Sequence, residues 1–370
     1  MDMNDDTSSV VALKLKYSSP VVLYESKRSF TRLFSPRPPS PKPVDFWLEE
    51  VFGQWETHKG TAALDGWIQR GVPDVVQGLM WQKLLANPLV VTPDLYDSVL
   101  KRVMCIRATL HISNARYRER ITKAFGRRAS LDQNQCHGCC LGGEVESFEQ
   151  IPIDISRSLP HFGVFSSLSP NSLRTHRERL RTILECAAVH RPDIGYVQGM
   201  ASLAGVFLLY LDEYSAFKCL VMTLTSPFLY DLYTFKSSAL RQHCVTFTSL
   251  LEDAFPKVAE LLDRHDVAPE SYIVPWFYTL YSVAFPEDLV RRVWDLYFLR
   301  GPVVLFQAAL VTIKMHENLI CLCDVDEWAP LFGNTSDLLN NVDVGRFTDL
   351  LSRSALTQKK LDDVSGGHCR

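Results

Sequence analysis

From Asp45 onward, apolar residues recur at intervals of three and four, and no stretch shows the regular alternation of a half-buried strand. This spacing strongly constrains the fold, because a 3.6-residue period gathers the apolar side chains of a helix on one face. The clearest helix begins near Asn171, a possible N-cap, and runs to His190, just before Pro192. With 46% hydrophobic residues, the 370-residue chain has ample material for a buried core. We therefore predict an all-α fold.

Further helices are predicted where the same spacing recurs between short segments that contain Gly or Pro. Their ranges are Phe46–Trp55, Val76–Ala86, Pro93–Ile106, Ala201–Leu211, Ala239–Phe255, Pro286–Leu299 and Val303–Cys321. The longest apolar stretch, Ala201–Leu211, has 11 residues, whereas about 20 are needed to cross a bilayer. We expect it to form a buried helix.

The N-terminal segment differs from the rest of the chain. Ser35–Pro43 contains five prolines in nine positions, which excludes the interior of a helix or sheet. We predict a disordered or linker tail at 1–44, a helical domain at 45–345 with a loop insertion at 105–147, and a C-terminal helix end and tail at 346–370. The tail could be a plain linker, a site of phosphorylation at its Ser-Pro pairs, or a ligand for a polyproline-binding partner.

Charge and cysteine content exclude several classes of protein. The 39 basic and 42 acidic residues leave a net charge of −3, so no positive field attracts nucleic acid or an anionic membrane. The N-terminus lacks the layout of a secretory signal, so we expect a cytoplasmic protein with reduced thiols. The cluster at 136–140, with Cys136, His137, Cys139 and Cys140, has the spacing of half a zinc site. Since no second pair accompanies it, we predict no metal and interpret the cluster as part of an exposed loop.

Two short segments carry side chains suited to phosphate chemistry. The first contains Asp154 and Arg157, and a guanidinium offers a permanent charge and a planar set of donors for phosphate oxygens. In a helical turn, the Asp154 carboxylate could hold Arg157 in one rotamer. Taken alone, the pair is typical of a surface ion pair without function, as most Asp/Arg pairs at this spacing are.

The second segment, Ile194–Met200, carries Gln198 between Tyr196 and Gly199. A glutamine at a helix start can project its amide toward a partner, and Gly199 permits close approach of another backbone. Tyr196 could wall such a site or simply pack in the core beneath it.

Together the two segments resemble the signature motifs I-x-x-D-x-x-R-S/T-x-P and Y-x-Q-G-M of the TBC domain, a GTPase-activating module for Rab-type small GTPases. Two further blocks, Gly71–Trp81 and Trp276–Gly301, resemble the opening and second-lobe signatures of that family. The resemblance covers about residues 60–320. It implies a two-lobed helical domain.

The resemblance also implies roles for individual residues. A Rab GTPase in its GTP form would receive an arginine finger and a glutamine finger in trans, so that the chain activates hydrolysis by its partner. The implied catalytic residues are Arg157 and Gln198, and the supporting residues are Asp154, Tyr196, Gly199, Ile151 and Pro160. The chain has no G-x-x-x-x-G-K-S/T loop, so we expect it to bring no cofactor, with GTP and Mg²⁺ carried by the partner. A role in vesicle trafficking and peripheral, Rab-mediated recruitment to endomembranes follow from the same resemblance.

The sequence departs from the family pattern at a few positions. Gln77 stands where the family usually has an arginine, four residues before Trp81, and Arg300 precedes Gly301 where an acidic residue is common. A non-catalytic Rab-binding or scaffold module is the alternative function, which the presence of both Arg157 and Gln198 disfavours, and a helical adaptor for membrane proteins is a third, indicated only by the Pro-rich tail.

Overall fold

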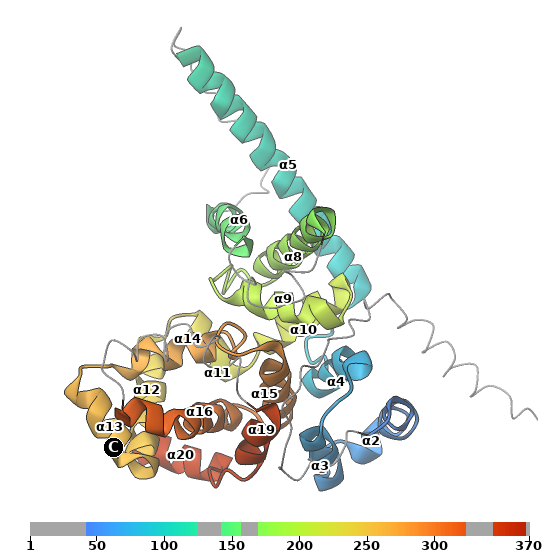
Figure 1. Ribbon diagram of the computed structural model, residues 1–370. Helices are drawn as coiled ribbons and strands as arrows, with labels where there is room; N and C mark the ends of the chain where they lie inside the picture. Colours follow the sequence, from blue (N-terminus) through green and yellow to red (C-terminus); the bar gives the residue numbers. More distant parts are fainter. Residues whose placement is uncertain (1–41, 125–141, 157–168, 323–342, 368–370) are drawn as a thin grey trace, which may run out of the picture.

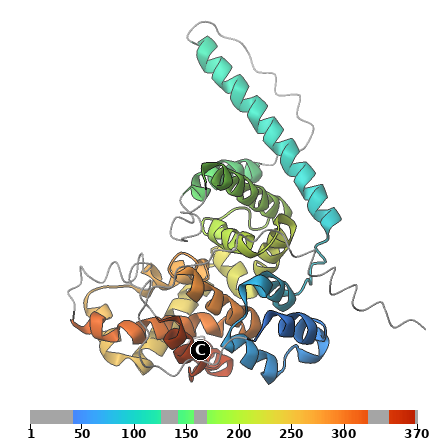
Figure 2. The same ribbon diagram turned by 45° about the vertical axis from the view of Figure 1, so that its right-hand side comes forward.

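The structure, a computed structural model, describes residues 42–124, 142–156, 169–322 and 343–367. Within these ranges every regular element is a helix and there is no strand, which confirms the all-α prediction. The helices form two lobes, and one helix, α5, extends from the upper lobe as a long rod (Figures 1 and 2).

The first lobe is built around α8, which packs against α5, α6, α9 and α10, while α4 packs against α9 and α10. Three short elements precede this lobe: a π-helical segment η1 (Phe46–Phe52), α2 (Trp55–His58) and α3 (Ala62–Arg70). The helices of the lobe are α4 (Asp74–Leu85), α5 (Pro93–Ala124), α6 (Gly142–Ile155), α8 (Pro170–His190), α9 (Met200–Tyr210) and α10 (Glu213–Thr223).

The second lobe packs α12 against α13 and α20, and α16 against α13, α15 and α19. Its elements are α11 (Pro227–Tyr233), α12 (Ser237–Ala254), α13 (Pro256–Arg264), a 3₁₀ turn η2 (Pro269–Ser271), α14 (Ile273–Tyr278), α15 (Glu287–Arg300), α16 (Val303–Leu322), α19 (Val344–Ser352) and α20 (Gln358–Gly367).

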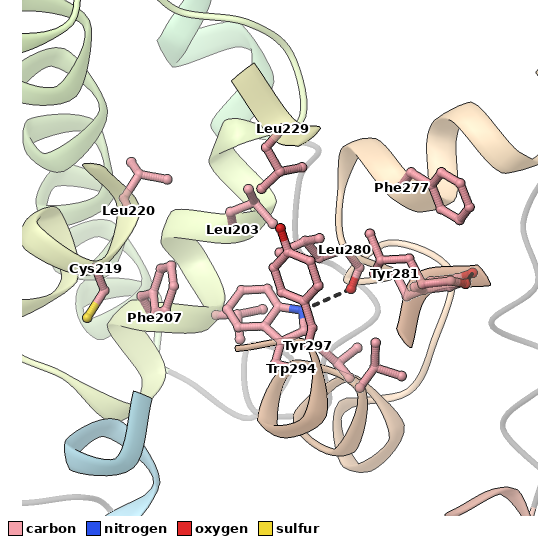
Figure 3. Close-up of a cluster of buried hydrophobic side chains, with 14 of the residues drawn as sticks. Leu203, Phe207, Cys219, Leu220, Leu229, Phe277, Leu280, Tyr281, Trp294 and Tyr297 are labelled. Atoms are coloured by element: carbon pink, nitrogen blue, oxygen red, sulfur yellow. Dashed lines mark hydrogen bonds between the residues drawn. The ribbon is translucent and has the colours of Figure 1, made fainter. Parts of the chain in front are cut away.

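Helix α15 joins the lobes, because it packs against α3 and α4 on one side and α16 and α19 on the other. Its Trp294 lies at the centre of the core that the lobes share (Figure 3), with ring centroids 4.9 Å from Phe207 and 5.2 Å from Trp81. The Trp294 indole N–H donates to the Leu280 carbonyl oxygen at 2.9 Å, so this large side chain is buried without an unpaired donor. The two lobes are therefore parts of one continuous core.

Most predicted helices begin and end within two residues of the observed bounds. The N-cap of α8 needs correcting: it is Ser169, whose hydroxyl accepts from the Ser172 N–H at 3.2 Å, and Asn171 lies inside the helix. The predicted helix Phe46–Trp55 is instead divided at Gly53 into η1 and α2.

The loop predicted at 105–147 is helical at both ends. Residues 105–124 continue α5, and residues 142–147 begin α6, so the prediction is wrong for these parts. The basic, Gly-containing sequence suggested a loop, yet residues 105–124 contain no Gly or Pro and half of them are strong helix formers, so they continue α5. Residues 125–141, with Cys136, His137, Cys139 and Cys140, lie outside the described residues, as does the proline-rich tail up to residue 41.

The helical domain also extends further than predicted at its C-terminal end. Beyond residue 345, Phe347, Leu351, Leu356 and Leu361 are buried because α19 packs on α15 and α16, and α20 packs on α12. The predicted boundary at 345 is therefore wrong, and the packed domain runs into α20.

Among the described helices, α16 is long and apolar enough to cross a membrane by length and composition. Of its most apolar 18-residue window, 61% is buried inside the protein, including Val304, Leu305 and Phe306. Burial in the second lobe is sufficient to explain its composition.

Candidate functional site

The predicted site lies where α6 meets the segment that joins α8 to α9. The structure describes Ile151, Asp154, Tyr196, Gln198 and Gly199, whereas Arg157 and Pro160 lie outside the described residues. Ile151, Asp154 and Tyr196 are brought together around α6, and Gln198 and Gly199 lie at the start of α9.

Asp154 faces the interior from the C-terminal part of α6 and is 1% exposed. Its Oδ1 accepts a hydrogen bond from Gln150 Nε2 at 3.1 Å, and its Oδ2 accepts one from the Tyr196 hydroxyl at 3.0 Å. A buried carboxylate requires such donors, because it loses its hydration on burial. The Asp154 side chain thus joins α6 to the segment before α9 from a buried position. It is not a residue of the protein surface.

The segment before α9 has a second connection to α6. The Tyr196 backbone N–H donates to the hydroxyl of Ser147 at 3.2 Å, and Ser147 is buried. The preceding Gly195 has a φ of +68°, in the left-handed region that favours glycine. Backbone and side chain of Tyr196 are therefore both held by α6.

Ile151 contributes packing to the site. It is fully buried and lies on one face of α6 with Phe148 and Ile155, spaced by three and four residues. These apolar contacts fix α6 against α8, so the carboxylate of Asp154 is presented from a rigid helix.

Gln198 is exposed, in contrast to the residues that support it. The next residue, Gly199, has a φ of +105°, and an added Cβ would lie 3.1 Å from Cδ1 of Tyr278 in α14. Glycine is needed here for both reasons: the backbone conformation is strained for other residues, and the space is filled by the second lobe. The close approach expected at Gly199 is made by an aromatic ring and not by another backbone.

An aromatic wall formed by Tyr233 and Tyr278 lies behind this segment. Their ring centroids are 4.5 Å apart, and the Tyr233 hydroxyl donates to the Tyr278 carbonyl oxygen at 2.6 Å. Burial raises the pKa of both phenols well above 10, so both remain protonated at neutral pH. The wall is a rigid, uncharged support for the Gln198 segment.

Where α4 of the first lobe meets α15, a buried polar cluster surrounds Asp295 and forms what we call the joint between the lobes. One of its members is Gln77, which departs from the family pattern. Gln77, 1% exposed, donates its amide to Asp295 Oδ1, and Trp81 Nε1 donates to the same oxygen at 2.9 Å. Arg292 Nη1 lies 3.9 Å from the other carboxylate oxygen, Oδ2. Burial raises the pKa of Asp295 from 3.8 to about 6, against the opposing effects of Arg292 and the two donors. Gln77 therefore retains a structural contact across the lobes.

Two other positions explain the sequence around this cluster. At Gly71, an added Cβ would lie 2.1 Å from Nη2 of Arg292, so glycine leaves room for the guanidinium. Arg300 forms an ion pair with Asp65 of α3 at 2.5 Å, which gives this departure from the family pattern a partner within the fold.

Sequence reasoning missed the roles of Ser147 and Gln150. Gln150 precedes Asp154 by one helical turn, a spacing that allows side-chain contact, so this partner could have been found. Ser147 and Tyr196 are 49 residues apart, and no local pattern connects them. Among the residues that the structure describes, no group of three or more His, Cys, Asp or Glu is placed to hold a metal ion.

Comparison with known proteins gives the site a context. A family model described as the Rab-GTPase-TBC domain matches residues 104–321. The chain is similar to TBC1 domain family member 12 of Xenopus tropicalis, with 30% identity over 279 residues that cover 75% of this chain and 38% of that protein. It is also similar to TBC1 domain family member 14 of Homo sapiens, with 29% identity over 279 residues, 75% of this chain and 37% of that protein. The chain thus spans little more than a third of these relatives.

Solved structures share the fold. The Chlamydomonas flagellar RabGAP TBC domain matches with a TM-score of 0.51 and 19% identity, covering 87% of this chain and 91% of that one. The Ypt/Rab-GAP domain of Gyp1p matches with a TM-score of 0.56 and 15% identity, covering 85% of this chain and 98% of that one.

Proposed function

This chain belongs to the Rab-GTPase-TBC domain family, and on that basis we propose that it accelerates GTP hydrolysis by a Rab-type small GTPase through Arg157 and Gln198. Both residues act in trans, at the nucleotide site of the bound partner. The chain itself is the activator, and the bond that breaks belongs to the partner's GTP.

The guanidinium of Arg157 stabilises the negative charge that develops on the transferred phosphoryl group. An arginine supplied in trans contributes about 10³ to 10⁵ to the rate of such reactions. Lysine does not replace it, because an ammonium keeps the charge but loses the planar pair of donors.

Gln198 orients the attacking water, since an amide both accepts and donates a hydrogen bond. The observation that supports this role best is the contrast between an exposed Gln198 and the buried contacts that hold its segment. Tyr196 is bonded to Asp154 and Ser147 on one side, and Gly199 lies against Tyr278 on the other. A side chain on such a fixed segment needs little reorganisation to act on a partner.

The partner supplies the nucleotide and its Mg²⁺, and we expect it to bind in the GTP form. Membrane contact is proposed to be indirect, through the Rab, so that the chain acts in the cytoplasm and is recruited peripherally to endomembranes. A partner for the proline-rich tail is part of the same proposal.

The test is single-turnover hydrolysis by a panel of GTP-loaded Rabs that covers the organism's full set. The wild-type chain should accelerate hydrolysis by at least one Rab, and Arg157→Lys and Gln198→Ala should each lower that rate by orders of magnitude. Arg177→Lys in α8 and Gln54→Ala are matched controls, since both residues are exposed and lie outside the site. All variants should keep the helical circular dichroism of the wild type.

Three results would argue against the proposal. An unchanged hydrolysis rate across the whole panel refutes the activator function. Binding of a GTP-loaded Rab without acceleration indicates the alternative, a non-catalytic Rab-binding module. Loss of activity that occurs only together with loss of helical signal refutes the specific roles of the two residues.

A further inference from the structure

We propose that Phe235 is an anchor for the partner GTPase, inserting into an apolar surface of that protein beside its nucleotide site. This inference rests on the proposed function and adds a recognition residue to it. The relevant feature is the backbone at the end of α11.

Phe235 has a conformation that usually belongs to glycine. It follows α11 with a φ of +53°, and the Lys236 N–H donates to the Asp231 carbonyl oxygen at 3.0 Å, which closes the helix end. This is the turn in which helices commonly place glycine at the left-handed position. A phenylalanine there is strained, because its Cβ crowds the backbone.

The Phe235 side chain contributes little to the stability of the fold. Phe235 is 63% exposed, and an exposed aromatic residue contributes little to folding free energy. Strain with exposure does not by itself mark a site, since Val90 has a φ of +52° and is 68% exposed in the loop between α4 and α5. What distinguishes Phe235 is its aromatic ring and its position.

Phe235 is connected to Gln198 through one intervening aromatic ring. The centroids of the Phe235 and Tyr278 rings are 6.2 Å apart, and Tyr278 is the residue against which Gly199 packs. Gly199 directly follows Gln198. Phe235 and the segment that carries Gln198 therefore both border the same ring, that of Tyr278.

A second set of contacts joins the end of α8 to α11 and to Lys236, the residue after Phe235. Arg191, at the end of α8, has its Cζ 5.6 Å from the centroid of the Tyr230 ring in α11, and Lys236 Nζ lies 5.4 Å from that ring. Lys236 also pairs with Asp231. A cluster of charged and aromatic side chains thus begins at the residue that follows Phe235, and exposed aromatic residues beside charged ones are common in protein interfaces.

The position of Gln198 decides which partner covers Phe235. A GTPase whose nucleotide reaches the Gln198 amide must lie over the start of α9, and the neighbouring Phe235 ring falls within the area that a protein interface covers. Phe235 should therefore affect how tightly the GTPase binds, while Gln198 affects how fast the bound complex reacts.

The test measures single-turnover hydrolysis against activator concentration, together with direct binding of the Rab loaded with a non-hydrolysable GTP analogue. Phe235→Ala should raise the half-saturating concentration and the Kd about 30-fold, with the saturating rate unchanged. Phe235→Gly should do the same while keeping or raising Tm, because glycine prefers this backbone conformation. Val90→Gly is the matched control and should leave both binding and saturating rate at wild-type values.

The outcomes separate this inference from the proposed function. A wild-type chain that accelerates hydrolysis while Phe235→Ala and Phe235→Gly stay within twofold of it overturns the anchor and leaves the function intact. A wild-type chain that binds a Rab without acceleration refutes the activator function, and the Kd of the same variants then decides the anchor. Absence of both binding and acceleration across the full panel overturns both proposals.

Discussion

Replacing Asp295 by asparagine should remove a pH dependence of stability that is built into the joint between the lobes. The Asp295 carboxyl is 1% exposed, receives hydrogen bonds from Gln77 and Trp81, and lies 3.9 Å from Arg292. Burial penalises its charged form more than these partners favour it, so its pKa rises from 3.8 to about 6.

The sign and size of the effect follow from this pKa. Because the folded state holds the proton more tightly than the unfolded state, the contribution is fully present below about pH 4 and is lost as pH rises through 6. A rise from 3.8 to about 6 corresponds to about 3 kcal/mol at neutral pH, since one pKa unit is about 1.4 kcal/mol. Against a total of about 5 to 15 kcal/mol, this is a large fraction.

The assay is urea unfolding of the wild type and Asp295→Asn at pH 4.5 and pH 7.5, followed by tryptophan fluorescence and circular dichroism. Asparagine also removes the attraction to Arg292, so the informative quantity is each protein's change in unfolding free energy between the two pH values. That change should be less favourable in the wild type than in the variant by about 2 kcal/mol, because pH 4.5 already lies above the unfolded pKa and part of the contribution of about 3 kcal/mol is lost there. Other titrating groups are the same in both proteins and cancel in the comparison.

Parallel pH profiles for the two proteins would refute the reasoning. That result would mean that Arg292 and the two donors compensate the burial of the carboxylate completely. A steeper loss in the variant would show that the ionised carboxylate stabilises the joint, which is opposite in sign to the effect expected from a raised pKa.

Three further changes test the site and the joint. Tyr196→Phe removes a hydroxyl that donates to the buried Asp154 carboxylate at 3.0 Å and should lower the free energy of unfolding in urea by about 2 kcal/mol. In the control Tyr214→Phe, the lost hydroxyl donates to a neutral carbonyl oxygen at 2.9 Å, so the loss should be about 1 kcal/mol. Equal losses would contradict a charge-assisted hydrogen bond at Tyr196. Gly199→Ala should lower the free energy of unfolding by about 2 to 3 kcal/mol, because the added Cβ would lie 3.1 Å from the Tyr278 ring. Gly301→Ala, with a φ of +81° but open space around it, should lower it by about 1 kcal/mol. Thermal unfolding of both variants measures this difference, and similar values would exclude the clash at Gly199. Gln77→Leu removes a hydrogen-bond donor to the buried Asp295 carboxyl and should lower the free energy of unfolding by about 2 kcal/mol at pH 7.5. The loss should be smaller at pH 4.5, where Asp295 is protonated. The same loss at both pH values in urea unfolding would show that Gln77 does not stabilise the ionised carboxylate.

The joint gives a physical account of the departure at Gln77. A neutral amide donates to Asp295 but brings no compensating charge, so the carboxylate is balanced only in part by Arg292. The contact across the lobes is thus retained, while its ionisation is left sensitive to pH. This sensitivity concerns stability and lies apart from the Gln198 segment.

Local patterns predicted much of the fold. The 3.6-residue spacing identified α8, α12 and α15, and continuous apolar stretches identified α9 and α16, because the burial of a helix is visible in a short stretch of sequence. It could not show that α5 continues to Ala124 or that α19 and α20 complete the second lobe. The docking of α19 and α20 depends on α12, α15 and α16, whose residues are far away in the chain, whereas the continuation of α5 was hidden by the basic, Gly-containing sequence around it.

The same division applies to the site. By itself, the sequence determined the helical class and the family resemblance, because these depend on residue type and order, and the proposed roles of Arg157 and Gln198 rest on that resemblance. Only the tertiary structure decided that Asp154 is buried against Tyr196, that Gly199 must admit Tyr278, and that Phe235 lies exposed beside them. The first two contacts join residues 42 and 79 positions apart, and side-chain proximity over such separations is fixed by how the lobes pack and not by any local spacing.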